Sequence, residues 1–266
     1  MEIIIRDDPE SVARVSAALV SAAVRKRKGA VLGLATGSSP LGTYRELRRL
    51  VESGRLDLSG VSGFALDEYV GIPADHPQSY AAVIRAEVVE PLRMDPRLVH
   101  VPDGRAVDLA AACRDYEAAI AAAGGIDVQI LGVGANGHIG FNEPSSSFAS
   151  RTRIKTLAAR TRADNARFFA SADEVPQHCL TQGLGTIMEA RQVVLVAQGA
   201  AKAAAVAAIV EGPVSARWPG SILQHHPNAV VVVDEAAAAR LELADYYRYV
   251  YDHKPAWQRV DLQQES

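Results

Sequence analysis

The chain has 266 residues, of which 48% are hydrophobic and 22% are charged, and this composition predicts a substantial core rather than a disordered chain. The formal net charge of −3 and the absence of a long basic stripe disfavour a nucleic-acid-binding protein. No run approaches the roughly 18 to 20 apolar residues that span a bilayer, and Met1–Arg6 is unlike a secretory signal, so we expect a cytoplasmic protein.

Short β-rich runs alternate along the chain with Ala-rich segments of helical period. In chain order we predict strand Glu2–Ile5, helix Pro9–Lys28, strand Val31–Leu34, a helix ending near Glu52, strand Val61–Leu66, and helices Tyr80–Pro91 and Leu109–Ala123. The chain continues with strand Val128–Leu131, an extended segment Arg151–Leu157, helix Thr161–Phe169, strand Gln192–Ala197, helix Ala200–Val210, strand Val230–Val233 and helix Glu235–Tyr251. This alternation is typical of the α/β class, in which helices flank a mostly parallel sheet. Because no repeat or linker interrupts it, we expect residues 1–266 to form a single domain with loops inserted after several strands.

The segment TGSSP, which follows the second predicted strand, has the features of an anion-binding loop. In an open α/β sheet, ligands bind beyond the carboxyl ends of the strands. Gly37 lets the backbone approach a ligand closely, and the next helix presents free N–H groups. The hydroxyls of Thr36, Ser38 and Ser39 can donate to phosphate oxygens, and Lys202, at the start of a later helix, can add a positive charge. The alternative is an ordinary Ser cap before a helix, but the two features together favour phosphate.

An acid pair, Asp67-Glu68, follows the third predicted strand. One interpretation is a helix cap or a solvated turn. The other is a general base, because the end of a strand holds a carboxylate more rigidly than a flexible loop does.

The fourth predicted strand leads into the loop GVGANGHIGFNEP, residues 132–144. His138 has the side chain whose protonation equilibrium lies nearest neutral pH, so it suits moving a proton to or from a sugar oxygen. If the loop folds back, Glu143 can accept a hydrogen bond from the His138 ring and so fix which ring nitrogen carries the proton. Asn136 can supply a hydrogen bond on the other side of His138. A single loop His is more often solvated, but the glycines, the strand-end position and Glu143 together favour catalysis.

We expect no metal or organic cofactor. No second His or Cys stands at ligand spacing from His138, and adjacent side chains such as His225-His226 point apart in most backbones. Cys113 and Cys179 lie far apart without metal-type spacing, so we expect small hydrophobes in a reducing compartment.

A base, an acid–base His and a phosphate-binding loop indicate proton transfer on a phosphorylated sugar. The residue chemistry alone does not separate an isomerase from a lactonase.

Five stretches closely resemble the glucosamine-6-phosphate deaminase family, also called glucosamine-6-phosphate isomerase. They are LGLATGSSPLGTY, FALDEYVGIPADHPQSY, GVGANGHIGFNEPSSSFASRTRIKTL, TRADNARFF and GAAKAAAVAAIVEGPVSA. The resemblance runs in order from about Val31 to Val233. It implies a modified Rossmann-like sheet and conversion of glucosamine 6-phosphate and water to fructose 6-phosphate and ammonia, in amino-sugar catabolism, without metal or organic cofactor.

The resemblance also implies a role for individual residues. Asp67 would take the C2 proton of the ring-opened substrate and return it at C1. His138 would act as the acid–base catalyst of ring opening, oriented by Glu143. The 6-phosphate would be held by Ser38, Ser39, Arg167 and Lys202, with Thr36 and Gly37 shaping the loop.

One position departs from the pattern of the well-known allosteric members, which carry an Asp where this chain has Asn136. Asn cannot ionise, so it can orient His138 but cannot stabilise an imidazolium by charge. We therefore expect Asn136→Asp to change the pH–rate profile. Other members of the family also carry Asn at this position, so activity itself is not in question.

Regulation is a further implication of the resemblance. Some members are hexamers activated by N-acetylglucosamine 6-phosphate between subunits, and Ser146, Arg153 and Lys155 match the positions that bind the phosphate of that activator. We therefore expect a homo-oligomer with this possible activator. The alternative is solvated charge on an extended segment. The Tyr246-Tyr247 region aligns ambiguously with the regulatory tyrosine of the family.

Two rival functions remain. A 6-phosphogluconolactonase resembles this family in fold and phosphate loop, but it lacks the DEYVG segment in this form, so Asp67 discriminates against it. A sugar-phosphate-sensing protein that has lost catalysis would lack Asp67, His138 or Glu143, and all three are present.

Overall fold

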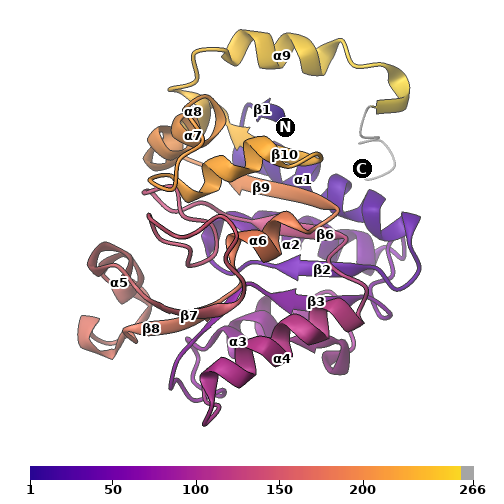
Figure 1. The fold of residues 1–266 in the computed structure, drawn as a ribbon. Helices are drawn as coiled ribbons and strands as arrows, with labels where there is room; N and C mark the ends of the chain where they lie inside the picture. The colour runs from indigo at the N-terminus through magenta and orange to yellow at the C-terminus, as the bar shows by residue number, and fades with distance from the viewer. Residues whose placement is uncertain (259–266) are drawn as a thin grey trace.

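The computed structural model describes residues 1–258, and within them seven strands form one parallel sheet (Figure 1). The strand order is β1-β10-β9-β6-β2-β3-β5. The strands are β1 (Glu2–Arg6), β2 (Val31–Leu34), β3 (Ser62–Ala65), β5 (Val99–His100), β6 (Val128–Leu131), β9 (Gln192–Ala197) and β10 (Ala229–Asp234). Nearly every residue of β6, β9 and β10 is buried, as expected for strands covered on both faces. The predicted α/β class is confirmed.

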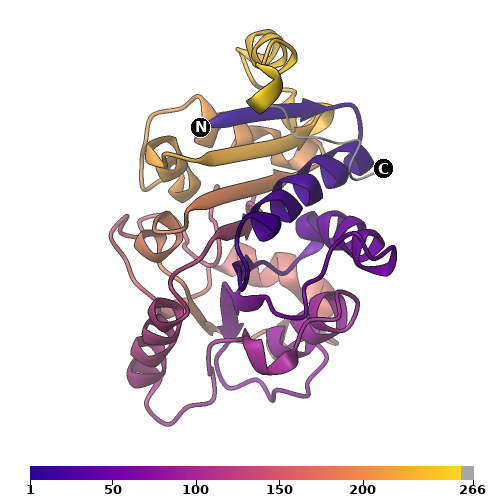
Figure 2. The same ribbon diagram turned by 90° about the vertical axis from the view of Figure 1, so that its right-hand side faces the viewer.

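Helices flank this sheet. The helices of the described residues are α1 (Pro9–Lys26), α2 (Ser38–Glu52), α3 (Tyr80–Ile84), α4 (Leu109–Ala122), α5 (Ala159–Asn165), α6 (Leu184–Met188), α7 (Ala203–Val210), α8 (Glu235–Ala238) and α9 (Ala244–Asp252), of which α5 lies away from the main sheet. Helix α1 packs against α2 and across β9 and β10 (Figure 2), and α9 lies beside the edge strand β1. Among the described residues, no helix combines the length and apolar character needed to cross a membrane.

Short 3-10 helices and one π-helix complete the described secondary structure. The 3-10 helices are Pro96–Leu98, Ala166–Phe168, Ala172–Glu174, Ala200–Lys202, Pro219–His225 and Ala256–Gln258, and the π-helix is Arg85–Val89. The single helix predicted over Tyr80–Pro91 is therefore α3 followed by the π-helix. Helix Ala200–Val210 likewise begins as a 3-10 turn before α7.

A second, antiparallel sheet was not predicted as a sheet. Its strand order is β4 (Asp67–Tyr69), β8 (His178–Thr181) and β7 (Arg153–Thr156). Only β7 falls within a predicted extended segment. β7 and β8 project from the main sheet, with α5 beside them (Figure 1).

The predicted C-terminal helix Glu235–Tyr251 is wrong as a continuous element. The structure divides it into α8 and α9 because Leu241 turns into the core and is 9% exposed. The Glu211 carboxylate accepts hydrogen bonds from the backbone N–H groups of Glu242 and Leu243, at 2.8 and 2.9 Å. This contact from a distant part of the chain fixes the turn.

The topology places two of the predicted loops together. β2 and β6 are neighbours in the centre of the sheet, but the chain leaves β2 toward β3 on one side, whereas β9 lies on the other side of β6. Such a reversal opens a crevice at the carboxyl ends of the two strands. The loops after β2 and β6 meet there, since a β-carbon at Gly132 would lie 3.6 Å from Ser39 Cβ.

Candidate active site

Asp67 lies where the chain passes from the parallel sheet into the small sheet. Leu66 continues the pairing of β3 with β2, because its N–H donates to Leu34 O at 2.9 Å, and Asp67 then opens β4. The Asp67 side chain is buried, and the loop after β6 passes over it. A β-carbon at Gly140, which has a φ of 52°, would lie 3.6 Å from Asp67 Oδ2.

This environment makes Asp67 an unusually basic carboxylate. Burial raises its pKa to about 8, the negative charge of Glu68 acts in the same direction, and a hydrogen bond from the Phe141 N–H opposes them. A carboxylate with such a pKa binds protons strongly near neutral pH. That property suits a residue that takes a proton from carbon and returns it.

Glu68 has a different role from its neighbour. Its carboxylate accepts backbone hydrogen bonds from Tyr69 at 2.8 Å and from Tyr80 and Ala81 at 2.9 Å each, so it caps the start of α3. Successive residues of a strand point to opposite faces, which separates the two acids. The cap interpretation therefore describes Glu68, and the general base at Asp67 stays a prediction.

His138, Asn136 and Glu143 come together within the loop after β6. His138 Nδ1 lies 3.6 Å from Glu143 Oε2 and has no hydrogen-bond partner among the described residues. Asn136 Nδ2 donates to the same Glu143 oxygen at 2.7 Å, and Asn136 Oδ1 accepts from the His138 backbone N–H at 3.3 Å. Asn136 thus holds Glu143 and the loop backbone rather than the imidazole ring.

Glu143 is held as an ionised carboxylate. Burial acts to raise its pKa, but the nearby His138 imidazole and the hydrogen bonds from Thr161 and Asn136 outweigh burial and lower the pKa to about 2. Thr161 Oγ1 donates to Glu143 Oε1 at 2.5 Å. The sequence had not indicated this contact; the only available signal was the place of Thr161 at the start of TRADNARFF.

Glycines of this loop make room for side chains. A β-carbon at Gly134 would lie 2.2 Å from His138 Cε1, so the imidazole rests directly on the Gly134 backbone. Gly137 has a φ of 79°, and a β-carbon there would lie 2.6 Å from the Trp218 ring. We therefore attribute these two glycines to packing of His138 and Trp218, in addition to the expected approach of a sugar.

The predicted phosphate-binding residues gather around the crevice between β2 and β6. Gly37, with a φ of 92°, precedes α2, and within residues 1–258 no side-chain hydrogen bond caps this helix start. Lys202 Nζ donates to Val133 O at 2.7 Å, which brings it to the loop after β6. Burial lowers the pKa of Lys202, and the negative charge of Asp164 opposes this effect. The positive charge of Arg167 lowers the pKa of Lys202 further, so Arg167 lies close enough to act on Lys202 electrostatically.

Two of the candidate regulatory residues, Arg153 and Lys155, are on β7, and Ser146 lies in the segment between β6 and β7. Ser146 is 2% exposed, and its Oγ has no hydrogen-bond partner within residues 1–258. Arg153 Nη1 donates to Arg151 O at 3.3 Å, whereas the buried Arg153 Nη2 finds no acceptor in the described part of the chain. Lys155 lies two residues further and thus on the same face of β7 as Arg153.

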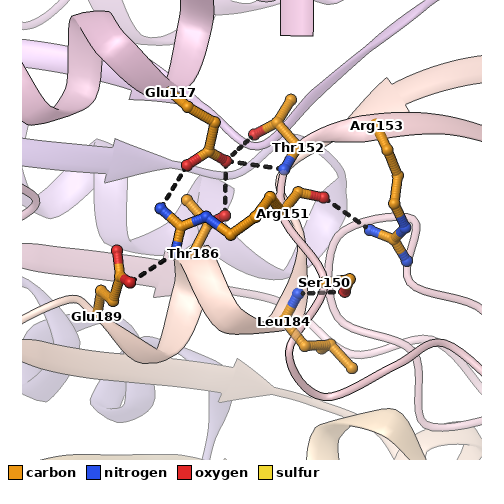
Figure 3. Close-up of polar contacts among 8 residues, drawn as sticks. All are labelled: Glu117, Ser150, Arg151, Thr152, Arg153, Leu184, Thr186 and Glu189. Carbon is orange, nitrogen blue, oxygen red and sulfur yellow. Dashed lines mark hydrogen bonds and ion pairs between the residues drawn. The ribbon is translucent and has the colours of Figure 1, made fainter. Parts of the chain in front are cut away.

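Glu117 on α4 fixes the chain just before β7 (Figure 3). Its carboxylate accepts from Thr152 N at 2.8 Å, Thr152 Oγ1 at 2.5 Å, Thr186 Oγ1 at 2.6 Å and Arg151 Nη2 at 2.5 Å. Arg151 also pairs with Glu189 at 2.5 Å. This cluster ties the entry of β7 to α4 and α6.

The two cysteines are buried, at 5% and 0% exposure for Cys113 and Cys179. Burial raises the pKa of both thiols. The described residues contain no group of three or more His, Cys, Asp or Glu side chains that could hold a metal ion.

Comparison with known proteins identifies the relatives of this chain. A family model described as glucosamine-6-phosphate isomerases/6-phosphogluconolactonase matches residues 8–232. Glucosamine-6-phosphate deaminase of Pseudarthrobacter chlorophenolicus is 58% identical over 98% of this chain and 100% of the relative. That of Cutibacterium acnes is 58% identical over 94% of this chain and 95% of the relative. The chain belongs to the glucosamine-6-phosphate deaminase family.

Solved structures agree with this assignment to the glucosamine-6-phosphate deaminase family. A monomeric glucosamine-6-phosphate deaminase matches with a TM-score of 0.88 and 39% identity, over 90% of this chain and 100% of the other. The 6-phosphogluconolactonase of Trypanosoma brucei matches with a TM-score of 0.67 and 20% identity, over 90% and 98%. The second likeness concerns the fold alone.

Proposed function

We propose that the protein converts glucosamine 6-phosphate and water to fructose 6-phosphate and ammonia. The observation that carries this proposal is a pair of buried carboxylates with opposed protonation behaviour beside one loop. Burial raises the pKa of Asp67 to about 8, whereas hydrogen bonds override burial at Glu143 and lower its pKa to about 2. Carboxylates whose pKa values are pushed apart in this way serve different steps of acid–base chemistry.

His138 and Glu143 act first, on the sugar ring. The C2–H bond becomes acidic only when C1 is carbonyl-like, so the ring must open before any proton leaves C2. His138 exchanges a proton with the ring oxygen, and the ionised Glu143, 3.6 Å from His138 Nδ1, orients the imidazole and stabilises its charged form.

Asp67 acts second, on the open chain. Its carboxylate takes the C2 proton, the electron pair forms the C1–C2 double bond, and the carbonyl oxygen at C1 takes the negative charge of the enolate. Asp67 then delivers the proton to C1 while the nitrogen lone pair forms an iminium at C2, and a proton of this iminium passes to the C1 oxygen. Water hydrolyses the resulting imine to the ketone and ammonia. One residue suffices for both transfers because C1 and C2 are adjacent and because its raised pKa favours holding the proton between them.

The phosphate positions the sugar for both steps. In this proposal Ser38, Ser39, Arg167 and Lys202 bind the 6-phosphate, with Thr36 and Gly37 shaping the loop. The approach of Lys202 Nζ to Val133 O and of Gly132 to Ser39 supports this assignment, because it brings charge and hydroxyl groups to one crevice. Holding the sugar by a remote group supplies much of the rate through orientation.

The direct test is ammonia release from glucosamine 6-phosphate by the purified protein, with Asp67→Asn as the comparison. We expect release by the parent and a loss of about 10²–10⁴-fold in the variant, the usual contribution of a general base. Hydrolysis of 6-phosphogluconolactone without ammonia release would overturn the proposal in favour of the lactonase. Binding of glucosamine 6-phosphate without turnover would favour a sensor.

We also propose activation by N-acetylglucosamine 6-phosphate at Ser146, Arg153 and Lys155 in a homo-oligomer, a hexamer if allosteric. Support comes from Ser146 Oγ and Arg153 Nη2, two buried donors without a partner among the described residues. A related deaminase is monomeric, so assembly needs its own test. Sedimentation and kinetics with and without the activator supply it: sigmoidal kinetics lost in Lys155→Ala are expected, and hyperbolic kinetics of a monomeric parent would overturn the proposal.

We place this chemistry in the cytoplasm. The charged sugar phosphate does not cross a bilayer unaided, and two buried free thiols suit a reducing compartment.

A further inference from the structure

The second oxygen of the Glu143 carboxylate has partners of its own. Glu143 Oε2 faces His138 and Asn136, whereas Oε1 accepts from Thr161 Oγ1 at 2.5 Å and from Ala158 N at 3.4 Å. The Thr161 side chain is buried, at 5% exposure, so water does not readily replace its hydroxyl. Thr161 is therefore the only side-chain donor to Oε1 among the described residues.

This contact controls the direction of the carboxylate. A carboxylate fixed at one oxygen can rotate about its side-chain bonds, but one held at both oxygens from two different segments cannot. Asn136 belongs to the loop after β6, and Thr161 belongs to α5. A displacement of a catalytic group by about 1 Å is enough to slow a reaction severely.

We propose that Thr161 is a positioning residue for ring opening, whose hydroxyl holds Glu143 so that its other oxygen faces His138. The inference rests on the proposed deaminase function. It assigns a role to a residue that does not itself touch the sugar.

The position of Thr161 on α5 also connects Glu143 to the proposed phosphate site. Arg167, a proposed phosphate ligand, lies in the 3-10 helix Ala166–Phe168 that directly continues α5. Phosphate binding at Arg167 therefore restrains the same segment that carries Thr161. Binding energy from a remote group of the substrate is in this way used to align the ring-opening pair.

The test compares Thr161→Val, which keeps the shape and removes the hydroxyl, with Thr161→Ser, which keeps the hydroxyl. A hydrogen bond to a charged group corresponds to about a 10- to 100-fold effect, so we expect kcat of Thr161→Val to fall by about this factor with little change in KM. Thr161→Ser is expected to recover most of the parent kcat.

An isotope effect separates positioning from general damage. With glucosamine 6-phosphate deuterated at C2, slower ring opening masks the C2–H step, so the isotope effect on kcat in Thr161→Val is expected to be no larger than in the parent. A larger isotope effect would mean that the Asp67 step was slowed instead, and would overturn the proposal. So would equal kcat values for the Val and Ser variants.

Thr186→Val is the matched control. Thr186 is also a buried threonine, 2% exposed, and its hydroxyl donates to a carboxylate, Glu117, at 2.6 Å, outside the proposed catalytic residues. We expect its kcat to stay within about threefold of the parent, since it removes an equivalent bond elsewhere. If Thr161→Val does not fold by circular dichroism, Thr161→Ala supplies the hydroxyl-free variant. A parent that releases no ammonia refutes the proposed function, whereas an active parent matched by Thr161→Val refutes only this inference.

Discussion

Asp67 and Glu143 are both buried, at 5% and 6% exposure, and yet the pKa of one carboxyl is raised to about 8 and that of the other is lowered to about 2. The difference lies in their partners. Glu143 faces His138 and accepts from Asn136 and Thr161 side chains. The opposing donor to Asp67 is one backbone N–H, and Glu68 adds a like charge. Burial alone therefore does not determine the protonation of a carboxylate; the donors around it do.

This difference in pKa suits the two carboxylates to different steps of the proposed reaction. An ionised Glu143 can support a charged imidazole throughout the reaction. A basic Asp67 can hold a proton between two carbon atoms.

Replacing Asp67 has the largest expected effect on activity. Asp67→Asn should lower kcat by about 10³-fold, because the proton acceptor is lost. The same change should stabilise the fold at pH 9. A raised pKa in the folded state favours the protonated carboxyl, so the native Asp67 costs stability progressively as the pH rises from about 4 through about 8.

Thermal unfolding of both proteins at pH 5 and pH 9 measures this second effect. Each pKa unit corresponds to about 1.4 kcal/mol, so the shift of about four units sets an upper bound of about 6 kcal/mol on the gain at pH 9. A variant less stable than the parent at pH 9 would contradict the buried, basic carboxylate.

Replacing Glu143 has the next largest effect. Glu143→Gln should lower kcat by about 10²-fold, because the imidazolium loses its charge partner. Its lowered pKa contributes stability that is present above the unfolded value near 4.5 and is lost as the pH falls through about 2. Denaturant titrations should therefore show a deficit at pH 7 that shrinks at pH 2, whereas an equal deficit at both values would argue against an ionised Glu143.

The charge of Glu68 helps to raise the pKa of Asp67. Glu68→Gln removes the negative charge that helps raise the pKa of Asp67, so the acid limb of the kcat/KM profile should move to lower pH. It should also destabilise the protein by about 1–3 kcal/mol, since one backbone donor at the start of α3 loses its acceptor. An unmoved acid limb would show that Asp67 does not control it.

The smallest change is expected from Asn136→Asp. Asn136 Nδ2 donates to Glu143 Oε2 at 2.7 Å, so the variant places two carboxylates in contact and raises the pKa of Glu143. Activity should therefore show a second fall at a pH below the acid limb that Asp67 sets, with kcat near pH 8 within about tenfold of the parent. A profile identical to that of the parent would mean that this hydrogen bond is irrelevant to catalysis.

The sequence predicted the main sheet well because its strands are short apolar runs separated by helical segments. β4, β5 and β8 escaped prediction because they are brief and pair only with distant segments, as where Asp67 lies opposite Thr181 and Gly63 opposite Val99. The break between α8 and α9 depends on Glu211, which approaches from elsewhere in the fold.

In the candidate site, too, some residues could be identified from local sequence and others only from tertiary contacts. Loop motifs pointed to Asp67, His138 and Glu143 as chemistry-bearing side chains, since their residue types carry that signal. The capping role of Glu68 and the contact of Thr161 with Glu143 depend on tertiary packing, and no local pattern encodes them.

The most direct measurement of the central contrast is a carboxyl carbon NMR titration of the protein, with signals assigned by Asp67→Asn and Glu143→Gln. The account predicts that Asp67 titrates near pH 8 and that Glu143 remains ionised down to about pH 2. Two carboxyls that titrate together in the ordinary range near pH 4 would contradict it.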